Sequence, residues 1–68
     1  MILNKKHLGK VVQLKNSRLN TKIDCIITEI KVNEVSVVYY EKEIEELIYK
    51  TLTEEDLIFN DYELKLLS

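Results

Sequence analysis

The sequence predicts a small, mainly β domain, and three observations support this. The chain has 68 residues, which suffice for one hydrophobic core and leave no material for a second. Hydrophobic residues make up 46% of the chain although alanine is absent, so large aliphatic side chains are available to fill that core. These residues occur in short, β-branched runs between polar turn formers, a pattern typical of strands. We therefore expect residues 1–68 to form one domain.

The first predicted strand covers residues 8–14 (LGKVVQL), a short run rich in valine and leucine. The segment that follows, KNSRLNTK, contains Asn16, Ser17 and Asn20, which favour turns. We expect a strand that ends at Leu14 and a polar loop after it.

Two further strands are predicted on either side of a tight turn. Residues 23–32 (IDCIITEIKV) are β-branched almost throughout, which suits a pleated sheet and costs side-chain freedom in a helix. Asn33 interrupts this run, and asparagine tolerates the backbone conformation of a hairpin turn. Residues 35–40 (VSVVYY) then form the third strand.

Both faces of the third strand are apolar. Side chains alternate across a strand, so Val35, Val37 and Tyr39 share one face, which we assign to the core. The opposite face carries Val38 and Tyr40 and is more apolar than an ordinary solvent-facing surface. We expect another element, a partner protein or a second copy of the chain to cover it.

Residues 41–52 (EKEIEELIYKTL) are compatible with two structures. Ile44, Leu47 and Ile48 have helical spacing, and glutamate and lysine favour helices, so one alternative is an α+β fold with a helix at 41–52. The other is an acidic hairpin loop that returns into a strand over residues 47–53, antiparallel to the third. We favour the hairpin.

The C-terminal residues predict a capped helical turn and a closing strand. Thr53 precedes the acidic run 54–56, so its hydroxyl can accept a bond from a free backbone N–H while the acids face the positive end of the helix dipole. Residues 62–67 (YELKLL) alternate between apolar and charged, and we expect alternate side chains from Tyr62 to Leu66 to point inward.

Five short strands, with a polar loop after the first and one helical turn before the last, resemble an SH3-like small barrel. The glycines that KOW-type modules place between their first two strands are missing, as are the tryptophan motifs of peptide-binding SH3 domains. The resemblance therefore implies a five-stranded barrel and no particular ligand. The residues that carry it are Gly9, Lys10, Val11, Val12, Ile27, Ile30, Val35, Val37, Tyr39, Glu55, Asp56 and Leu57.

The charge of the chain is divided between its two ends. Residues 1–22 contain six basic residues and no acid, whereas residues 23–68 carry all twelve acids against four lysines. One alternative function is therefore nucleic-acid binding, because a basic segment can neutralise phosphates. Another is that the acidic clusters imitate nucleic acid and occupy a basic site on a host protein. The phosphate-binding candidates are Lys5, Lys6, Lys10, Lys15, Arg18 and Lys22.

The sequence offers little for catalysis or metal binding. His7 and Cys25 are its single histidine and cysteine, so a nucleophile has no evident base and a structural zinc site lacks its four ligands. Adjacent acids such as Glu45 and Glu46 lack the glycine and the alternating oxygen ligands of a calcium loop. We expect no enzyme activity, no metal and no cofactor, and we expect Cys25 to be a small buried hydrophobe.

The leading prediction is a noncatalytic, cytoplasmic protein-binding module without a membrane partner. No apolar run approaches the length of a membrane span, and the first residues lack the pattern of a secretory signal. Short chains rich in lysine and isoleucine resemble accessory proteins of phages, which implies a modulator or inhibitor of a host protein. The simplest version of this prediction is a homo-oligomer that forms through the partner-binding surface. The partner-binding candidates are Val38, Tyr40, Glu41, Glu43, Glu45 and Glu46.

Overall fold

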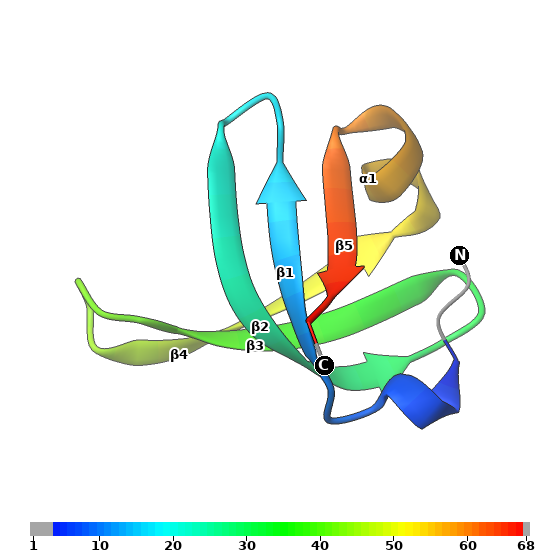
Figure 1. The fold of residues 1–68 in the computed structure, drawn as a ribbon, viewed down its shortest axis with the longest axis horizontal. Helices are drawn as coiled ribbons and strands as arrows, with labels where there is room; N and C mark the ends of the chain where they lie inside the picture. The colour runs from blue at the N-terminus through cyan, green and yellow to red at the C-terminus, as the bar shows by residue number, and fades with distance from the viewer. Residues whose placement is uncertain (1–3, 68) are drawn as a thin grey trace.

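The computed structural model describes residues 4–67 and shows a single antiparallel sheet of five strands. A 3-10 turn at Lys5–His7 precedes the sheet, and helix α1 (Glu54–Phe59) connects the last two strands (Figure 1). The strands lie in the order β4-β3-β2-β1-β5. They are β1 (Val11–Asn16), β2 (Thr21–Ile30), β3 (Glu34–Glu41), β4 (Glu46–Thr53) and β5 (Tyr62–Leu66).

The mainly β prediction is confirmed, and the alternative of a helix at 41–52 is wrong. Residues 42–45 form a turn, and Glu41 and Glu46 face each other at the end of the β3–β4 ladder. Glu45 has a φ of 53°, which lets the chain reverse within this short turn. The helical spacing in this segment is outweighed by pairing along the whole of β3, because a strand's stability depends on its neighbours more than on intrinsic propensity.

The boundaries of β1 differ from the prediction of residues 8–14. Gly9 lies before the strand with a φ of 79°, and its backbone N–H donates to the carbonyl of Ile27. Asn16, which we expected in the loop, is the buried last residue of β1. Its side-chain oxygen accepts a bond from the backbone N–H of Leu19 at 3.0 Å, so it stabilises the turn from within the strand.

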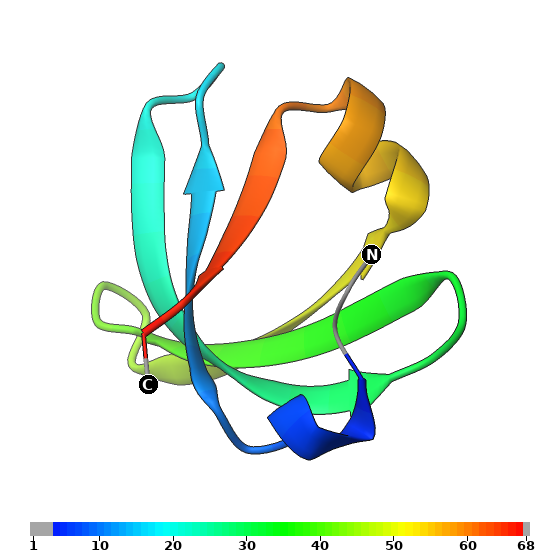
Figure 2. The same cartoon turned by 45° about the vertical axis from the view of Figure 1, so that its right-hand side comes forward.

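The sheet curls around its own core. β2 is ten residues long and bends, so that its first half runs beside β1 and its second half beside β3 (Figure 2). Cross-strand pairs such as Val12 with Cys25 and Ile27 with Val37 bring the inward side chains together. In the described part of the chain, the buried apolar residues are Val12, Leu14, Cys25, Ile27, Val35, Val37 and Leu52.

The inward face matches the prediction, and only its C-terminal end is incompletely covered. Val35 and Val37 are buried in the core, and Tyr39, Tyr62 and Leu64 are partly buried and pack against the core cluster. Burying an aliphatic side chain of this size stabilises the fold by about 1.5–3 kcal/mol. Leu66 is aligned with the buried Val12 and therefore lies on the expected inward face, but at the end of β5 it remains 40% exposed.

The curled sheet does not close into a complete barrel. Within the described residues, no ladder joins β4 to β5, and helix α1 packs against both strands. The Lys50 Nζ atom donates to the Tyr62 hydroxyl at 2.9 Å and lies 4.7 Å from the centre of its ring. This contact and α1 therefore hold the open seam together. The strand order, with a short helix before β5, is compatible with an SH3-like shape.

Helix α1 begins with the predicted cap. The Thr53 hydroxyl accepts a bond from the Asp56 backbone N–H, and the Asp56 carboxylate accepts one from the Thr53 backbone N–H at 3.0 Å. The Asn60 side chain donates to the other carboxylate oxygen at 2.9 Å. The bonds from Thr53 and Asn60 lower the pKa of Asp56 below its ordinary value of 3.8.

The seam contact predicts that Lys50→Met lowers the free energy of unfolding by about 1–2 kcal/mol, because it removes a hydrogen bond and a cation–π contact while keeping the apolar stem. Lys42→Met, in the exposed β3–β4 turn, is the matched control and should change it by less than about 0.5 kcal/mol. The hydrogen bond to Tyr62 raises the pKa of Lys50 above its ordinary value of 10.5. Its stabilising effect should be complete below pH 10.5 and be lost as the pH rises through the higher folded value. Equal denaturation midpoints for wild type and Lys50→Met would show that the seam does not depend on this contact.

The cap predicts a pH-dependent difference in melting temperature between wild type and the Asp56→Asn variant. Because the folded-state pKa of Asp56 is lowered, its charge stabilises the fold above pH 3.8 and this stabilisation is lost as the pH falls through the folded value. Thermal unfolding should therefore show wild type as the more stable protein near neutral pH. The two melting temperatures should converge as the pH falls below 3.8 and through the folded-state pKa. A gap that stays the same size from neutral pH into acid would contradict the assignment.

Candidate functional site

A row of apolar side chains crosses the face of the sheet that looks away from the core. The register aligns Val11 of β1 with Ile26 of β2. Ile26 is aligned with Val38 of β3, and Val38 with Tyr49 of β4. Directly paired residues share a face, so these four side chains form one continuous row over four strands. Ile26 is 45% exposed and Tyr49 is 71% exposed.

A second pair extends this row toward the tip of the β3–β4 hairpin. Tyr40 and Leu47 face each other on the same side of the sheet and are 56% and 59% exposed. On a sheet with one face in water, the outward-facing side chains are normally polar, whereas here they are apolar. We refer to this surface as the outer patch, and it consists of Val11, Ile26, Val38, Tyr40, Leu47 and Tyr49.

The predicted acidic residues lie at the tip of the same hairpin, which projects from the rest of the sheet (Figure 1). Glu41 and Glu46 end the two strands, and Glu43 and Glu45 lie in the turn between them. The backbone N–H of Glu43 donates to the Glu41 carboxylate at 3.4 Å. The structure thus brings the predicted partner-binding residues, Val38 and Tyr40 included, onto one hairpin.

Sequence reasoning missed four residues of the outer patch: Val11, Ile26, Leu47 and Tyr49. Each lies on a different strand from Val38 and Tyr40, and only the register shows that they share a surface. A signal for two of them is present, because Leu47 and Tyr49 alternate with the inward Ile48 and Lys50.

The predicted phosphate-binding residues do not gather on one surface. Lys5, Lys6 and Lys10 precede β1, whereas Lys15, Arg18 and Lys22 lie at or near the β1–β2 turn. Four residues of β1 lie between Lys10 and Lys15 and separate the two groups by about 17 Å. Lys15 is paired with Glu63 of β5, so an acid also lies within the second group.

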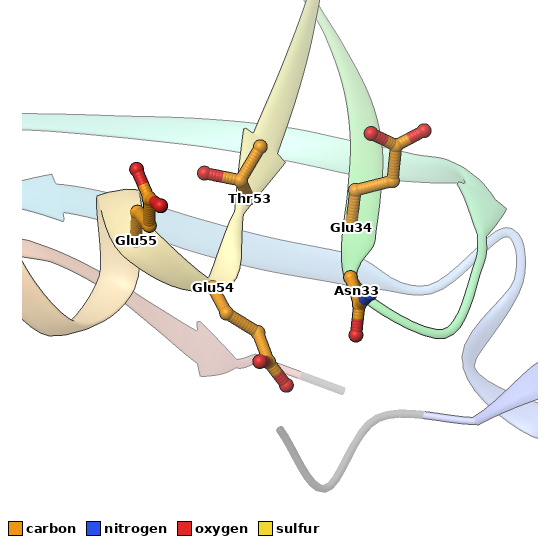
Figure 3. A pocket seen from close by; sticks show the side chains of 5 residues that line it. All are labelled: Asn33, Glu34, Thr53, Glu54 and Glu55. Atoms are coloured by element: carbon orange, nitrogen blue, oxygen red, sulfur yellow. The ribbon is translucent and has the colours of Figure 1, made fainter.

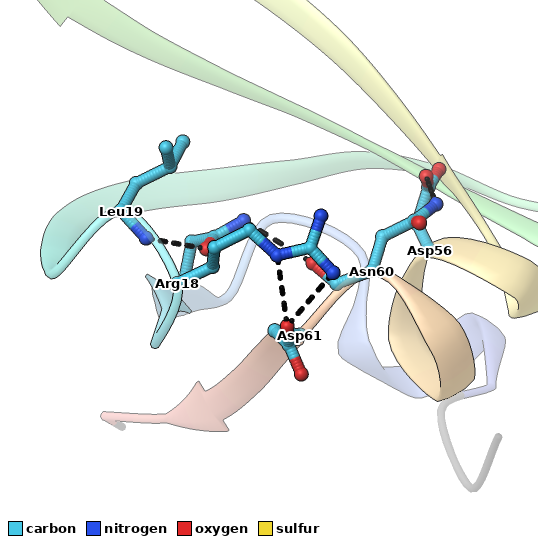
Figure 4. A network of polar contacts seen from close by, with 6 residues as sticks. Arg18, Leu19, Asp56, Asn60 and Asp61 are labelled. Atoms are coloured by element: carbon cyan, nitrogen blue, oxygen red, sulfur yellow. Dashed lines mark hydrogen bonds and ion pairs between the residues drawn. The ribbon is translucent and has the colours of Figure 1, made fainter.

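A polar network around the β1–β2 turn explains the position of Arg18 (Figure 4). The Arg18 guanidinium contacts the Asp61 carboxylate at 3.2 Å. Asn16 donates to the backbone carbonyl of Asn60 at 3.3 Å, next to Asp61. These bonds fasten the turn to the segment between α1 and β5, which indicates a structural role for Arg18.

A shallow depression of about 350 Å³ lies at the end of the β3–β4 hairpin opposite its tip (Figure 3). Its lining includes three carboxylates, of which Glu34 contacts Lys31 at 3.5 Å. The Thr53 hydroxyl in the lining is already bonded in the helix cap. The depression contains no nucleophile beside a base, so it offers no evident catalytic chemistry. Its lining residues are Asn33, Glu34, Thr53, Glu54 and Glu55.

The remaining reactive residue types occupy structural positions. Cys25 is buried in β2, and burial raises the pKa of its thiol, so less of the nucleophilic thiolate is present at neutral pH. The Nδ1 atom of His7 accepts a bond from the Asn4 backbone N–H at 3.0 Å within the N-terminal turn. Over residues 4–67, no three His, Cys, Asp or Glu side chains are arranged to hold a metal ion.

Comparisons with protein-family models, curated proteins and solved structures find no significant match to this chain. In the part of the chain that the structure describes, no helix has the length and apolar character needed to cross a membrane.

The two faces of β3 predict losses of stability of different size for the same substitution at neighbouring positions. Val37→Thr places a hydroxyl in the core and should cost about 1–3 kcal/mol of unfolding free energy. Val38→Thr changes the outer patch and should cost less than about 1 kcal/mol, because the patch is not part of the core. Denaturant titration of both variants measures the difference. Equal losses would mean that the outer patch is needed for folding.

Proposed function

We propose that this chain is a noncatalytic protein-binding module that docks through the outer patch. The observation that supports this most strongly is the register that aligns apolar side chains of four strands on one exposed face. Tyr40 and Tyr49 provide large, rigid surface with a polar end, a residue type enriched at interface hot spots. Both lie on paired strands, so ordering them on binding costs little backbone entropy.

The proposed setting is the cytoplasm, and the proposed partner is a host protein. A single cysteine that is buried and unpaired suits a reducing compartment. The lysine- and isoleucine-rich composition resembles that of short phage accessory proteins, which supports a role as a modulator or inhibitor of the partner. Occupying a surface of the partner would need no chemistry beyond the docking itself.

Two other binding partners are alternatives to this proposal. A second copy could cover the outer patch, which would make the chain a homo-oligomer. Nucleic acid could bind the basic residues, although their division between the two ends of β1 gives this alternative less geometric support. A steep loss of affinity for DNA or RNA with added salt would be its signature.

Site-specific photo-cross-linking tests the proposal. Tyr40 and Tyr49 are replaced one at a time by benzoylphenylalanine, and Glu63 on β5 is replaced as the matched exposed control. After irradiation in an extract of the organism that encodes the chain, both patch positions should cross-link to the same protein and the control position should not. The double variant Val38→Ser, Tyr40→Ala should reduce that capture at least about ten-fold.

Three results would contradict the proposal. Equal cross-linking from the Glu63 position would mean that the outer patch is not the docking surface. Products that contain only this chain would assign the patch to self-association. Wild-type capture by the double variant, together with a strict monomer in light scattering, would remove the evidence for any function of the patch.

A further inference from the structure

β4 has a long free edge. In the strand order β4-β3-β2-β1-β5 it ends the sheet, and β3 is its one described neighbour. All eight residues of β4 pair with β3 in an unbroken register, whereas the β2–β3 ladder shifts between Ile27 and Glu29. An edge strand presents unpaired backbone N–H and C=O groups, which readily accept another strand.

Apart from the charge of Glu46 at its first position, the tip half of β4 lacks the usual protections of an edge strand. The chain has no proline, and the β3–β4 ladder has no bulge. The inward-pointing Lys50, a typical protecting residue, lies in the second half and is engaged with Tyr62. The other edge, β5, is shorter and carries the exposed Lys65. The tip half of β4 instead exposes Leu47 and Tyr49 of the outer patch.

Acidic residues flank both ends of this edge. Glu45 and Glu46 lie at the hairpin tip, and Glu54 and Glu55 follow β4 beside the depression. Residues 34–56 contain eight acids and two lysines, a net charge of −6, whereas the whole chain has −2. Antiparallel pairing of β4 with β4 of a second copy would place the two acidic ends side by side. Like-charge repulsion therefore disfavours a second copy at this edge and favours a basic partner.

We infer that the free edge of β4 binds an extended segment of a basic protein by β-strand addition. Main-chain hydrogen bonds to β4 would supply affinity, and the side chains would supply specificity. Alternate apolar residues of the added strand would continue the outer patch beside Leu47 and Tyr49, and lysine or arginine at its ends would face the acidic flanks. The inference rests on the proposed function, because it specifies the class of partner for the same surface.

Three fluorescein-labelled peptides test this with the full chain. The first, KKVTVTKK, has alternating apolar residues and basic ends, the second replaces every lysine by glutamate, and the third is KKVTVTKK with its four central amides N-methylated. Fluorescence anisotropy should show the tightest binding for the first peptide and none for the glutamate peptide. The methylated peptide should bind at least about ten-fold more weakly than the first, because it cannot complete the ladder. Equal binding of the first and third peptides, or no binding of the first, would overturn the inference.

A charge-reversal pair tests the position of the contact. Glu46→Lys should weaken binding of KKVTVTKK about five-fold, whereas Glu63→Lys, the same change on the exposed face of β5, should weaken it less than about two-fold. Equal effects would mean that net charge alone attracts the peptide. A dimer in light scattering whose stability rises in the Glu46→Lys variant would assign the edge to a second copy and also overturn the inference.

The peptide and cross-linking experiments can fail independently. If Tyr40 and Tyr49 cross-link to one protein but the methylated peptide binds as well as its parent, the patch docks a partner without strand addition. The proposed function then stands and the inference about the edge fails. If the parent peptide adds to β4 but the patch captures nothing beyond the Glu63 control, the proposed function fails.

Discussion

The register between neighbouring strands is the constraint on which the rest of this structure depends. A slip of one residue would move every side chain of a strand to the opposite face. In the observed register, Ile27 and Val37 meet inside the core, while the adjacent residues Ile26 and Val38 meet outside it. The core and the outer patch are therefore two results of the same pairing. The register that buries the core residues therefore also decides which side chains form the outer patch.

The sheet is open between β4 and β5, so these two strands form its edges. β4 and β5 are connected by α1 and by the bond from Lys50 to Tyr62, with no ladder between the described strands. The tip half of β4, beyond Lys50, therefore remains free to bind another strand. The acidic residues at both ends of β4 bias that binding by charge, so the incomplete barrel and the charge distribution support the same class of partner.

Much of the fold could be predicted because its signals are local. Alternation and β-branched composition identify β2, β3 and β5, and Thr53 with Asp56 marks the start of α1. Asn16 was placed wrongly because its side chain makes a turn from inside the strand, and sequence alone does not distinguish the two positions. The outer patch was predicted only on β3. Val11 on β1 and Ile26 on β2 join Val38 through pairings that no local pattern encodes, whereas Leu47 and Tyr49 on β4 follow the alternation of the adjacent hairpin strand.

Solution NMR provides the most direct measurement of the register. NOE contacts should connect the side chain of Val38 with those of Ile26 and Tyr49, and the side chain of Val37 with that of Ile27. Contacts that join Val38 to the buried Leu52, or that place Tyr49 beside Val37 on the inner face, would show a shifted register and contradict the existence of the outer patch.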